Sequence, residues 1–261
     1  MILTMDAGNT SIKLGIYDDN GHMRQYGRIS TDINKTSDEY GLTMLSVFQY
    51  AHIDPVSVKG VIYSSVVPSL NVTLENMCHT FFHLNPFCVG PGMKTGMAIK
   101  YDNSRELGAD RICTAVAAYE KYGGPCVVID FGTATTFGAI SDTGDFLGGA
   151  IMPGVKVSLQ GLITGTARLP NIEIKKPNHV IGKNTVENMQ SGLLYGYTGA
   201  VETLIKRIKK EMGYVPKKIK VIATGGLARV MVFDNQIIDT IDSYLTIDGL
   251  YILYKRNTVL A

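Results

Sequence analysis

Cysteine is scarce in this chain of 261 residues, and its spacing shows no pattern typical of disulfide crosslinks or of a metal site. No two cysteines have C-x-x-C spacing, three of them lie among apolar neighbours, and the five histidines do not cluster. The four positions are Cys78, Cys88, Cys113 and Cys126. We therefore expect reduced thiols, most of them buried, rather than disulfide or metal chemistry.

The chain also has little net charge and lacks long apolar runs. The formal net charge is +2 at pH 7, which gives no bulk attraction to nucleic acid or to a polyanionic surface. No uninterrupted apolar stretch is long enough to span a bilayer, and the first residues lack the basic and apolar regions of a signal peptide. With 45% hydrophobic and 18% charged residues, the composition predicts a cytoplasmic globular protein without nucleic-acid or membrane partners.

Two aspartate-led turns, rich in glycine and hydroxyl side chains, are the strongest positive signal. They are Asp6-Ala7-Gly8-Asn9-Thr10-Ser11-Ile12-Lys13 and Asp130-Phe131-Gly132-Thr133-Ala134-Thr135-Thr136, each after an apolar run. Glycine lets a backbone approach a phosphate closely, and amides and hydroxyls donate to its oxygens. The leading carboxylate can lie near a cation that neutralises the phosphates. Two such turns in separate halves predict a nucleotide polyphosphate held in a cleft between duplicated domains.

Each turn also has an ordinary structural interpretation. Gly8-Asn9 is a common pair at the tip of a tight hairpin, so the first turn alone favours neither interpretation. The threonines of the second turn suit the start of a strand, although a plain hairpin does not need three hydroxyls directly after a carboxylate.

The same order of elements occurs twice along the chain, which predicts an α/β fold with an internal duplication. The first series has strands at 2–5, 12–17, 23–29, 60–65 and 87–89 and helices at 37–50, 69–82 and 111–122, with Ser69 as a helix N-cap. The second has strands at 126–130, 135–140, 146–151 and 219–223 and helices at 155–164 and 185–212. The Gly-Gly-Pro sequence after Tyr122 suggests a boundary, so we expect domains at 1–122 and 123–261.

Two further segments complete the predicted site. Gly225 and Gly226 follow the buried strand at 219–223, and paired glycines there would let a nucleobase or ribose lie on the backbone. A plain strand-to-helix turn would also need these glycines.

In the Glu106–Arg111 block, Asp110 can accept the proton of an acceptor hydroxyl and Arg111 can bind a carboxylate in bidentate fashion. The structural alternative, Asp110 as the N-cap of a helix starting at Arg111, is compatible with this role.

Together these motifs resemble type III pantothenate kinase. The resemblance is carried by the two turns, the Gly108–Arg111 block and Thr224-Gly225-Gly226, and it extends over the chain through Ser65-Val66-Val67-Pro68, Pro153-Gly154, Gly182-x-x-Thr185 and Leu245-Thr246-x-x-Gly249-Leu250. It implies the acetate and sugar kinase, Hsp70 and actin-like ATPase fold, with a ribonuclease H-like core in each half. It also implies ATP-dependent phosphorylation of pantothenate to 4'-phosphopantothenate, the first step of coenzyme A biosynthesis. Mg²⁺, a monovalent cation (K⁺ or NH₄⁺) and a cytoplasmic homodimer with the pantothenate pocket at or near its interface are implied as well.

The resemblance also assigns roles to individual residues. Asp110 matches the general base, and Asp130 matches the ligand of the monovalent cation. The pantothenate-binding positions are Tyr101, Gly108, Ala109, Arg111 and Thr185. The ATP-binding positions are Asp6, Ala7, Gly8, Asn9, Thr10, Ser11, Ile12, Lys13, Thr133, Gly225 and Gly226, with Asp6 also close to Mg²⁺ through the phosphates. One departure is Ser104, which stands where the family usually has a proline that would stiffen the loop.

Three other functions remain open at this stage. A kinase of the same fold could act on a sugar or another small acid, although the Gly108–Arg111 block argues against it. A non-catalytic accessory factor for transcription would not need a base, two phosphate turns and a cation ligand together. An actin-like filament former would need a polymerisation insert, and none is evident.

Overall fold

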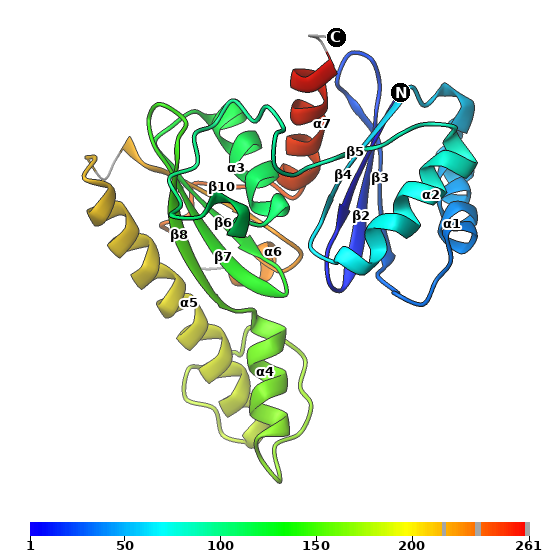
Figure 1. Cartoon of the computed structure of the whole chain (residues 1–261). Coiled ribbons are helices and arrows are strands. Elements are labelled where there is room, and N and C mark those ends of the chain that lie inside the picture. Colours follow the sequence, from blue (N-terminus) through cyan, green and yellow to red (C-terminus); the bar gives the residue numbers. More distant parts are fainter. Residues whose placement is uncertain (216–217, 233–235, 259–261) are drawn as a thin grey trace. The chain divides into compact units, whose positions relative to one another are not determined.

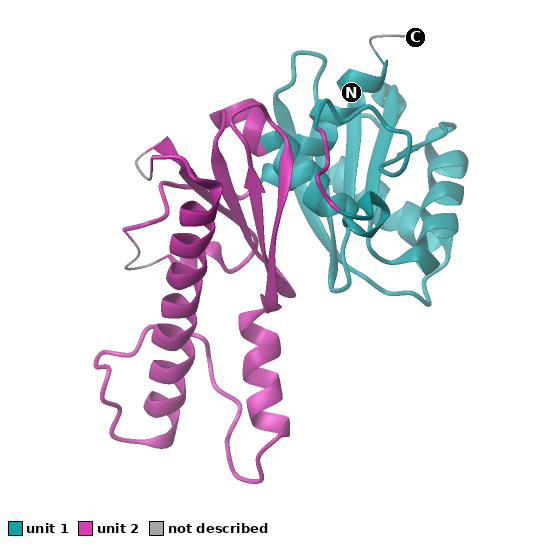
Figure 2. Cartoon of the chain, turned by 60° about the vertical axis from the view of Figure 1, so that its left-hand side comes forward, with its two compact units in different colours: residues 1–97, 102–117, 244–261 teal, residues 98–101, 118–243 magenta. Residues whose placement is uncertain are grey.

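Two mixed sheets organise the chain, as the computed structural model shows for residues 1–215, 218–232 and 236–258 (Figure 1). They belong to two compact units (Figure 2). The first unit contains residues 1–97, 102–117 and 244–261, and the second contains residues 98–101 and 118–243. The unit boundaries follow packing, so the C-terminal segment belongs with the first sheet; the domain division predicted at residue 122 stays a prediction.

The sheet of the first unit has the strand order β3-β2-β1-β4-β5. Its strands are β1 (Ile2–Ala7), β2 (Ser11–Tyr17), β3 (Met23–Ser30), β4 (Gly60–Ser65) and β5 (Phe87–Cys88). β1 lies antiparallel to β2 and parallel to β4. The edge of the sheet where β1 and β4 end therefore also carries the turn between β1 and β2.

The sheet of the second unit repeats this arrangement in the order β10-β9-β6-β7-β8. Its strands are β6 (Cys126–Phe131), β7 (Ala134–Ile140), β8 (Phe146–Pro153), β9 (Lys220–Thr224) and β10 (Thr240–Ile241). β6 lies antiparallel to β7 and parallel to β9, as β1 does to β2 and β4. The predicted duplicated α/β fold is confirmed, and the cleft predicted between the halves stays a prediction.

Five helices lie close to their predicted positions: α1 (Ser37–Tyr50), α2 (Asn71–Phe82), α3 (Ala109–Tyr122), α4 (Val155–Thr164) and α5 (Thr185–Met212). The helices α6 (Ala228–Met231) and α7 (Leu245–Thr258) were not predicted. Short 3₁₀ turns occupy Pro55–Ser57, Pro68–Leu70 and Ser104–Glu106. α1 begins with a capping box in which Thr36 and Glu39 satisfy each other's amides. In the second unit α4 and α5 run beside each other (Figure 2).

The N-cap predicted at Ser69 is wrong. Ser69 lies inside the 3₁₀ turn Pro68–Leu70, and α2 starts only at Asn71, with Leu70 at the cap position and no side-chain hydrogen bond there. A capping serine needs an extended backbone so that its hydroxyl can reach the amides of the first turn. Pro68 instead starts helical geometry one turn early, and Ser69 follows it into that turn.

Alternation along the strands separates a core face from a functional face in each sheet. In the first unit Leu3 and Met5 pack with α1 and α2 in one buried cluster, while Thr4 and Asp6 point to the other face. In the second unit Val127 and Ile129 pack with α5, and Asp130 points away from them by the same alternation. Both leading aspartates therefore lie on the sheet face opposite the main apolar core.

The last helix, α7, packs on the first sheet, which the sequence did not predict. The Tyr17 hydroxyl donates to Asp248 at 2.5 Å, and the Tyr17 and Tyr251 rings stack with centroids 4.5 Å apart. A Cβ at Gly15 would lie 2.3 Å from Ile247. The absence of a side chain at Gly15 lets α7 lie against the face of the sheet that carries Asp6.

All four cysteines are free thiols, and Cys78, Cys113 and Cys126 are buried while Cys88 is exposed. Burial raises the pKa of Cys78 and of Cys126 to about 12, because a thiolate loses its hydration there. Within the described residues no helix has the length and apolar character needed to cross a bilayer.

Candidate functional site: two phosphate-type turns and an aspartate-arginine block

Asp6 is held on both of its carboxylate oxygens at the end of β1. Ser64, its partner in the parallel register with β4, donates a hydrogen bond to Oδ1 at 2.8 Å. Lys13, its partner in the antiparallel register with β2, places Nζ 3.1 Å from Oδ2. Only 7% of the Asp6 side chain is exposed, so its charge is offset by Lys13 and its orientation is fixed.

The residues after Asp6 form a tight hairpin. The Gly8 amide donates to the Ser11 carbonyl at 3.1 Å, and the Thr31 hydroxyl donates to the Gly8 carbonyl at 2.6 Å. Asn9 and Thr10 are exposed at the tip. The hairpin geometry is thus present, and the exposed tip leaves donors that a phosphate can reach; phosphate binding itself stays a prediction.

The Gly108–Arg111 block forms the start of α3. The Gly108 carbonyl accepts from the amides of Arg111 and Ile112 at 3.1 and 3.2 Å, so helical bonding begins earlier than expected and α3 starts at Ala109. The prediction that Asp110 caps a helix beginning at Arg111 is therefore wrong. Asp110 lies in the first turn, where its Oδ1 accepts from the Arg111 amide at 2.9 Å, and a carboxylate is favoured by the positive end of the helix dipole.

The Gly108–Arg111 block lies near the end of β1 that carries Asp6. A Cβ at Gly108 would lie 3.9 Å from Val66 Cγ1, and the Val66 amide donates to the Ala7 carbonyl at 3.0 Å. Cys113 lies on α3 one turn after Asp110 and is fully buried. Burial, followed by the negative charges of Asp6 and Asp110, raises the pKa of its thiol.

Gly108→Ala is expected to disturb Asp110 specifically. A Cβ at Gly108 would lie 2.5 Å from Asp110 Oδ1, so the carboxylate must rotate away. A displacement of about 1 Å in a catalytic group can cost about 100-fold in rate, and we expect a loss of 10- to 100-fold in kcat by a coupled ADP assay. Gly199→Ala, on α5 with no atom within 4 Å of the new Cβ, is the control. An unchanged kcat in Gly108→Ala would contradict the placement of Asp110.

In the second unit the Asp130 turn and the Thr224–Gly226 turn lie beside each other. Asp130 and Thr224 are partners in the parallel register of β6 and β9, and the Leu227 amide reaches the Phe131 carbonyl at 3.4 Å. Gly225 has a φ of +95°, and a Cβ there would lie 2.3 Å from Asp130 Oδ1. Glycine is thus required at position 225 by both the backbone conformation and the space.

The second turn is also fixed from its far side. The Gly154 amide donates to the Thr133 carbonyl at 3.0 Å, and a Cβ at Gly154 would lie 2.2 Å from that oxygen. Thr135 is fully buried, and its hydroxyl lies 2.7 Å from the Tyr197 hydroxyl. Thr133 is exposed. Of these two threonines, therefore, Thr133 is the one accessible to a phosphate, while Thr135 anchors the turn.

The remaining predicted residues are distributed between the units. Tyr101 lies in the second unit with its ring stacked on Phe146, centroids 5.9 Å apart. Thr185 is the exposed first residue of α5 in the same unit. Arg111 lies in the first unit, half-buried beside Asp110. A common pantothenate pocket for these residues stays a prediction.

Possible cation ligands occur singly. Among residues 1–215, 218–232 and 236–258, no group of three His, Cys, Asp or Glu side chains could hold a metal ion. At each turn the donors are one carboxylate, hydroxyls and backbone carbonyls, which are the hard oxygen ligands that Mg²⁺ accepts together with substrate phosphates. The residues present therefore fit a cation bound jointly with a nucleotide.

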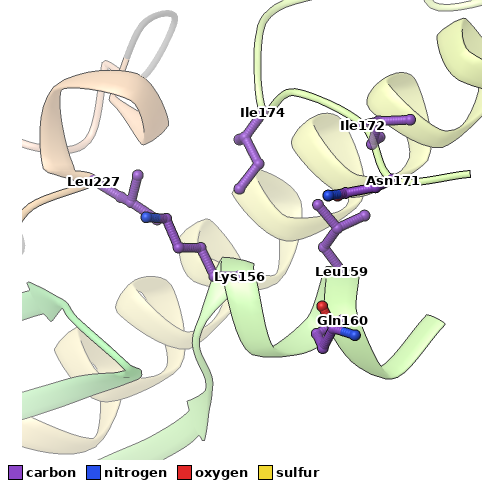
Figure 3. A pocket seen from close by; sticks show the side chains of 7 residues that line it. All are labelled: Lys156, Leu159, Gln160, Asn171, Ile172, Ile174 and Leu227. Carbon is purple, nitrogen blue, oxygen red and sulfur yellow. The ribbon is translucent and has the colours of Figure 1, made fainter. Parts of the chain in front are cut away.

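A cavity of about 390 Å³ lies in the second unit beside the Gly225-Gly226 turn. Figure 3 shows Lys156 and Leu159 on α4, Ile174 on the segment before α5, and Leu227 at the end of the paired-glycine turn. The remaining lining residues are Gln160, Asn171 and Ile172. Apolar walls with a few polar groups are typical of small-molecule sites.

Comparison with known proteins identifies the family. Residues 2–207 match the family model described as type III pantothenate kinase. The chain belongs to the type III pantothenate kinase family. The resemblance predicted from the motifs is thereby confirmed, and membership places the chain among kinases that use ATP.

Solved structures similar to this type III pantothenate kinase family member support its fold. A candidate Baf family transcriptional activator from Campylobacter jejuni has a TM-score of 0.61 at 19% identity, covering 98% of both chains. The activator of 2-hydroxyisocaproyl-CoA dehydratase from Clostridium difficile, with bound ADPNP, has a TM-score of 0.55 at 14% identity, covering 99% of this chain and 96% of that one. A candidate N-acetylmannosamine kinase from Listeria monocytogenes has a TM-score of 0.51 at 12% identity, covering 98% and 99%. At these identities the similarity shows the fold alone.

The sequence did not point to two residues that shape the two turns. Ser64 donates to the Asp6 carboxylate, and the Tyr197 hydroxyl donates to the Pro153 carbonyl. A signal existed for Ser64, since it is a polar residue in an apolar strand that pairs with β1. For Tyr197 no comparable signal exists, because only folding brings α5 to the end of β8.

Proposed function

We propose that this protein transfers the γ-phosphoryl group of ATP to the primary hydroxyl of pantothenate, giving 4'-phosphopantothenate, the first step of coenzyme A biosynthesis. The observation that carries the proposal is the Gly108–Arg111 block at the start of α3, which lies against Val66 at the end of the strands that hold Asp6. Family membership supports the same conclusion.

In this proposal Asp110 accepts the proton of the pantothenate hydroxyl as the phosphoryl group transfers. Its position next to the backbone of Gly108 and Arg111 fixes the carboxylate without a long flexible stem. Arg111 binds the pantothenate carboxylate through its planar guanidinium. Gly108, Ala109, Tyr101 and Thr185 are the other proposed pantothenate contacts.

The two turns bind the phosphates of ATP. In the first, the exposed amides and hydroxyls of Asn9 and Thr10 donate to phosphate oxygens, and Lys13 adds positive charge next to Asp6. In the second, Thr133 is the accessible hydroxyl. Gly225 and Gly226 border the adenosine in this proposal, on the turn that lies beside the Asp130 turn. Phosphoryl transfer needs positioning and charge neutralisation more than covalent catalysis, which such turns can supply.

Mg²⁺ and a monovalent cation fit the donors of the two turns. Asp6 supplies the carboxylate nearest the Mg²⁺ that accompanies ATP, and Asp130 supplies one for K⁺ or NH₄⁺ beside the backbone carbonyls of its turn. Both cations would offset phosphate charge. This chain's residues then hold the nucleotide and the acceptor and move the proton to Asp110.

Asp130→Ala is expected to weaken the activation by K⁺. Removing the carboxylate leaves the proposed cation site without its charged ligand, so the half-activating K⁺ concentration should rise by about tenfold or more, in line with losses of roughly 1.5–3 kcal/mol for interactions with a charged group. A K⁺ titration of the initial rate measures this. Asp142→Ala, at an exposed carboxylate of the same unit, should leave the titration unchanged. An identical K⁺ response in Asp130→Ala would disprove the assignment.

An acceptor panel tests the proposed substrate. The purified protein is incubated with ATP, Mg²⁺ and K⁺ and with pantothenate, N-acetylmannosamine or another small hydroxy acid, and the products are analysed by mass spectrometry. We expect the mass of a phosphomonoester only with pantothenate. Phosphorylation of a sugar instead would favour the related-kinase alternative.

A non-catalytic role in transcription is the second candidate, because the Campylobacter jejuni structure is described as a candidate transcriptional activator. That function requires DNA binding and no turnover. A gel-shift assay tests the first requirement, and the acceptor panel tests the second.

We further propose a cytoplasmic homodimer, which the resemblance to the family also implies. Sedimentation equilibrium at micromolar concentration tests the dimer and would also reveal filaments.

A further inference from the structure

Ser64 lies on β4, beside the leading aspartate of the first turn. It is fully buried, and its hydroxyl donates to Asp6 Oδ1 at 2.8 Å. One short, buried side chain thus holds one oxygen of the Asp6 carboxylate.

A serine hydroxyl has a single proton, and in Ser64 that proton is directed to the carboxylate of Asp6. Lys13 engages the other oxygen of the same carboxylate at 3.1 Å.

We propose that Ser64 is a positioning residue of the phosphoryl-transfer site, which orients the Asp6 carboxylate. The proposal rests on the proposed function and deepens it. With Ser64 on Oδ1 and Lys13 on Oδ2, the plane of the Asp6 carboxylate is fixed. Removing one donor would let that plane rotate next to the bound phosphates.

The duplicated fold supplies an independent comparison. Thr224 occupies in the second unit the register position next to Asp130 that Ser64 occupies next to Asp6 in the first. Both sites are buried. A hydroxyl residue beside the leading carboxylate therefore recurs in both halves, and a threonine is accommodated at this place in a strand.

Ser64→Ala, Ser64→Thr and Tyr63→Phe form the test set. Tyr63 is the matched control because it lies on the same strand but faces the opposite side of the sheet, where its hydroxyl donates to Glu75 at 2.6 Å. Both Ser64→Ala and Tyr63→Phe thus remove a hydroxyl-to-carboxylate hydrogen bond from β4. Only the first touches Asp6.

The readouts are kcat, the KM for pantothenate, the affinity for Mg²⁺·ATP by calorimetry and the thermal midpoint. We expect Ser64→Ala to lower kcat by about 10- to 100-fold, the size typical of losing a hydrogen bond to a charged group, with the KM for pantothenate within about twofold. Ser64→Thr should retain most of the wild-type kcat. Tyr63→Phe should lower the thermal midpoint and leave kcat unchanged.

The proposal is overturned if Ser64→Ala keeps its kcat within about twofold of the wild type, or if Tyr63→Phe loses as much as Ser64→Ala. If Ser64→Ala does not fold, Ser64→Cys replaces it. Its kcat is expected to lie between the wild-type value and a tenfold loss, and a wild-type kcat would overturn the proposal.

A wild-type protein that does not phosphorylate pantothenate would contradict the proposed function instead. In that case the affinity for Mg²⁺·ATP tests the role of Ser64. This affinity should fall in Ser64→Ala and stay at the wild-type value in Tyr63→Phe. Equal affinities in the two variants would overturn the proposal.

Discussion

Asp110→Asn is expected to lower kcat for pantothenate phosphorylation by about 10²–10⁴-fold, the usual contribution of a general base. An amide has nearly the shape of the carboxylate but cannot accept the proton of the acceptor hydroxyl. The measurement is steady-state ADP release at saturating ATP and pantothenate. Because Asp110 Oδ1 already accepts from the Arg111 amide, an asparagine oxygen can keep that hydrogen bond and the start of α3.

The control measurements for this variant are its affinity for ATP and its thermal stability. Calorimetry should give a wild-type affinity for ATP, since the proposed ATP contacts lie in the two turns, and the thermal midpoint should stay close to that of the wild type. Near-full turnover in Asp110→Asn would show that another group takes the proton. A variant that had lost ATP affinity as well would show that Asp110 acts on the nucleotide.

The second large effect is expected for Gly225→Ala. A Cβ at this position would lie 2.3 Å from Asp130 Oδ1 and 2.6 Å from the Phe131 amide nitrogen, and the φ of +95° is unfavourable for any other residue. Strain of about 1–3 kcal/mol from the backbone adds to about 1–3 kcal/mol from overpacking. We expect the free energy of unfolding to fall by about 2–5 kcal/mol, together with a loss of ATP affinity.

Denaturant unfolding and ATP calorimetry measure these two effects. Gly196→Ala is the matched control, because it is the same substitution on α5 with no atom within 4 Å of the new Cβ. It should be neutral or slightly stabilising, since alanine favours a helix over glycine by about 1 kcal/mol. If Gly225→Ala were as stable as Gly196→Ala and bound ATP normally, the required proximity of the two turns would be refuted.

The sequence predicted the fold well where local signals were strong. The two hairpins begin with an aspartate and a glycine between apolar strands, and both formed as expected. The long helix Thr185–Met212 was predicted with its bounds, and in the structure Asn184 caps its start and Gly213 ends it. Repetition of the same element order then sufficed to predict a duplicated α/β fold.

Prediction was weaker where tertiary packing decides. α7 packs on the first sheet although it follows the second unit in sequence. No local sequence pattern indicates that the chain comes back to the first unit. Ser64 is a polar residue in an apolar strand, but only the pairing of β1 with β4 brings its hydroxyl to Asp6. The start of α3 was misplaced because the Gly108 carbonyl, rather than the Asp110 side chain, begins the helical bonding.

The most direct test of the account is the release of ADP by the purified protein with ATP, Mg²⁺ and K⁺, measured with and without pantothenate. The account predicts a large stimulation by pantothenate that depends on K⁺ and is lost in Asp110→Asn. Release of ADP at the same rate with and without pantothenate, or none at all from a protein that binds ATP, would contradict it.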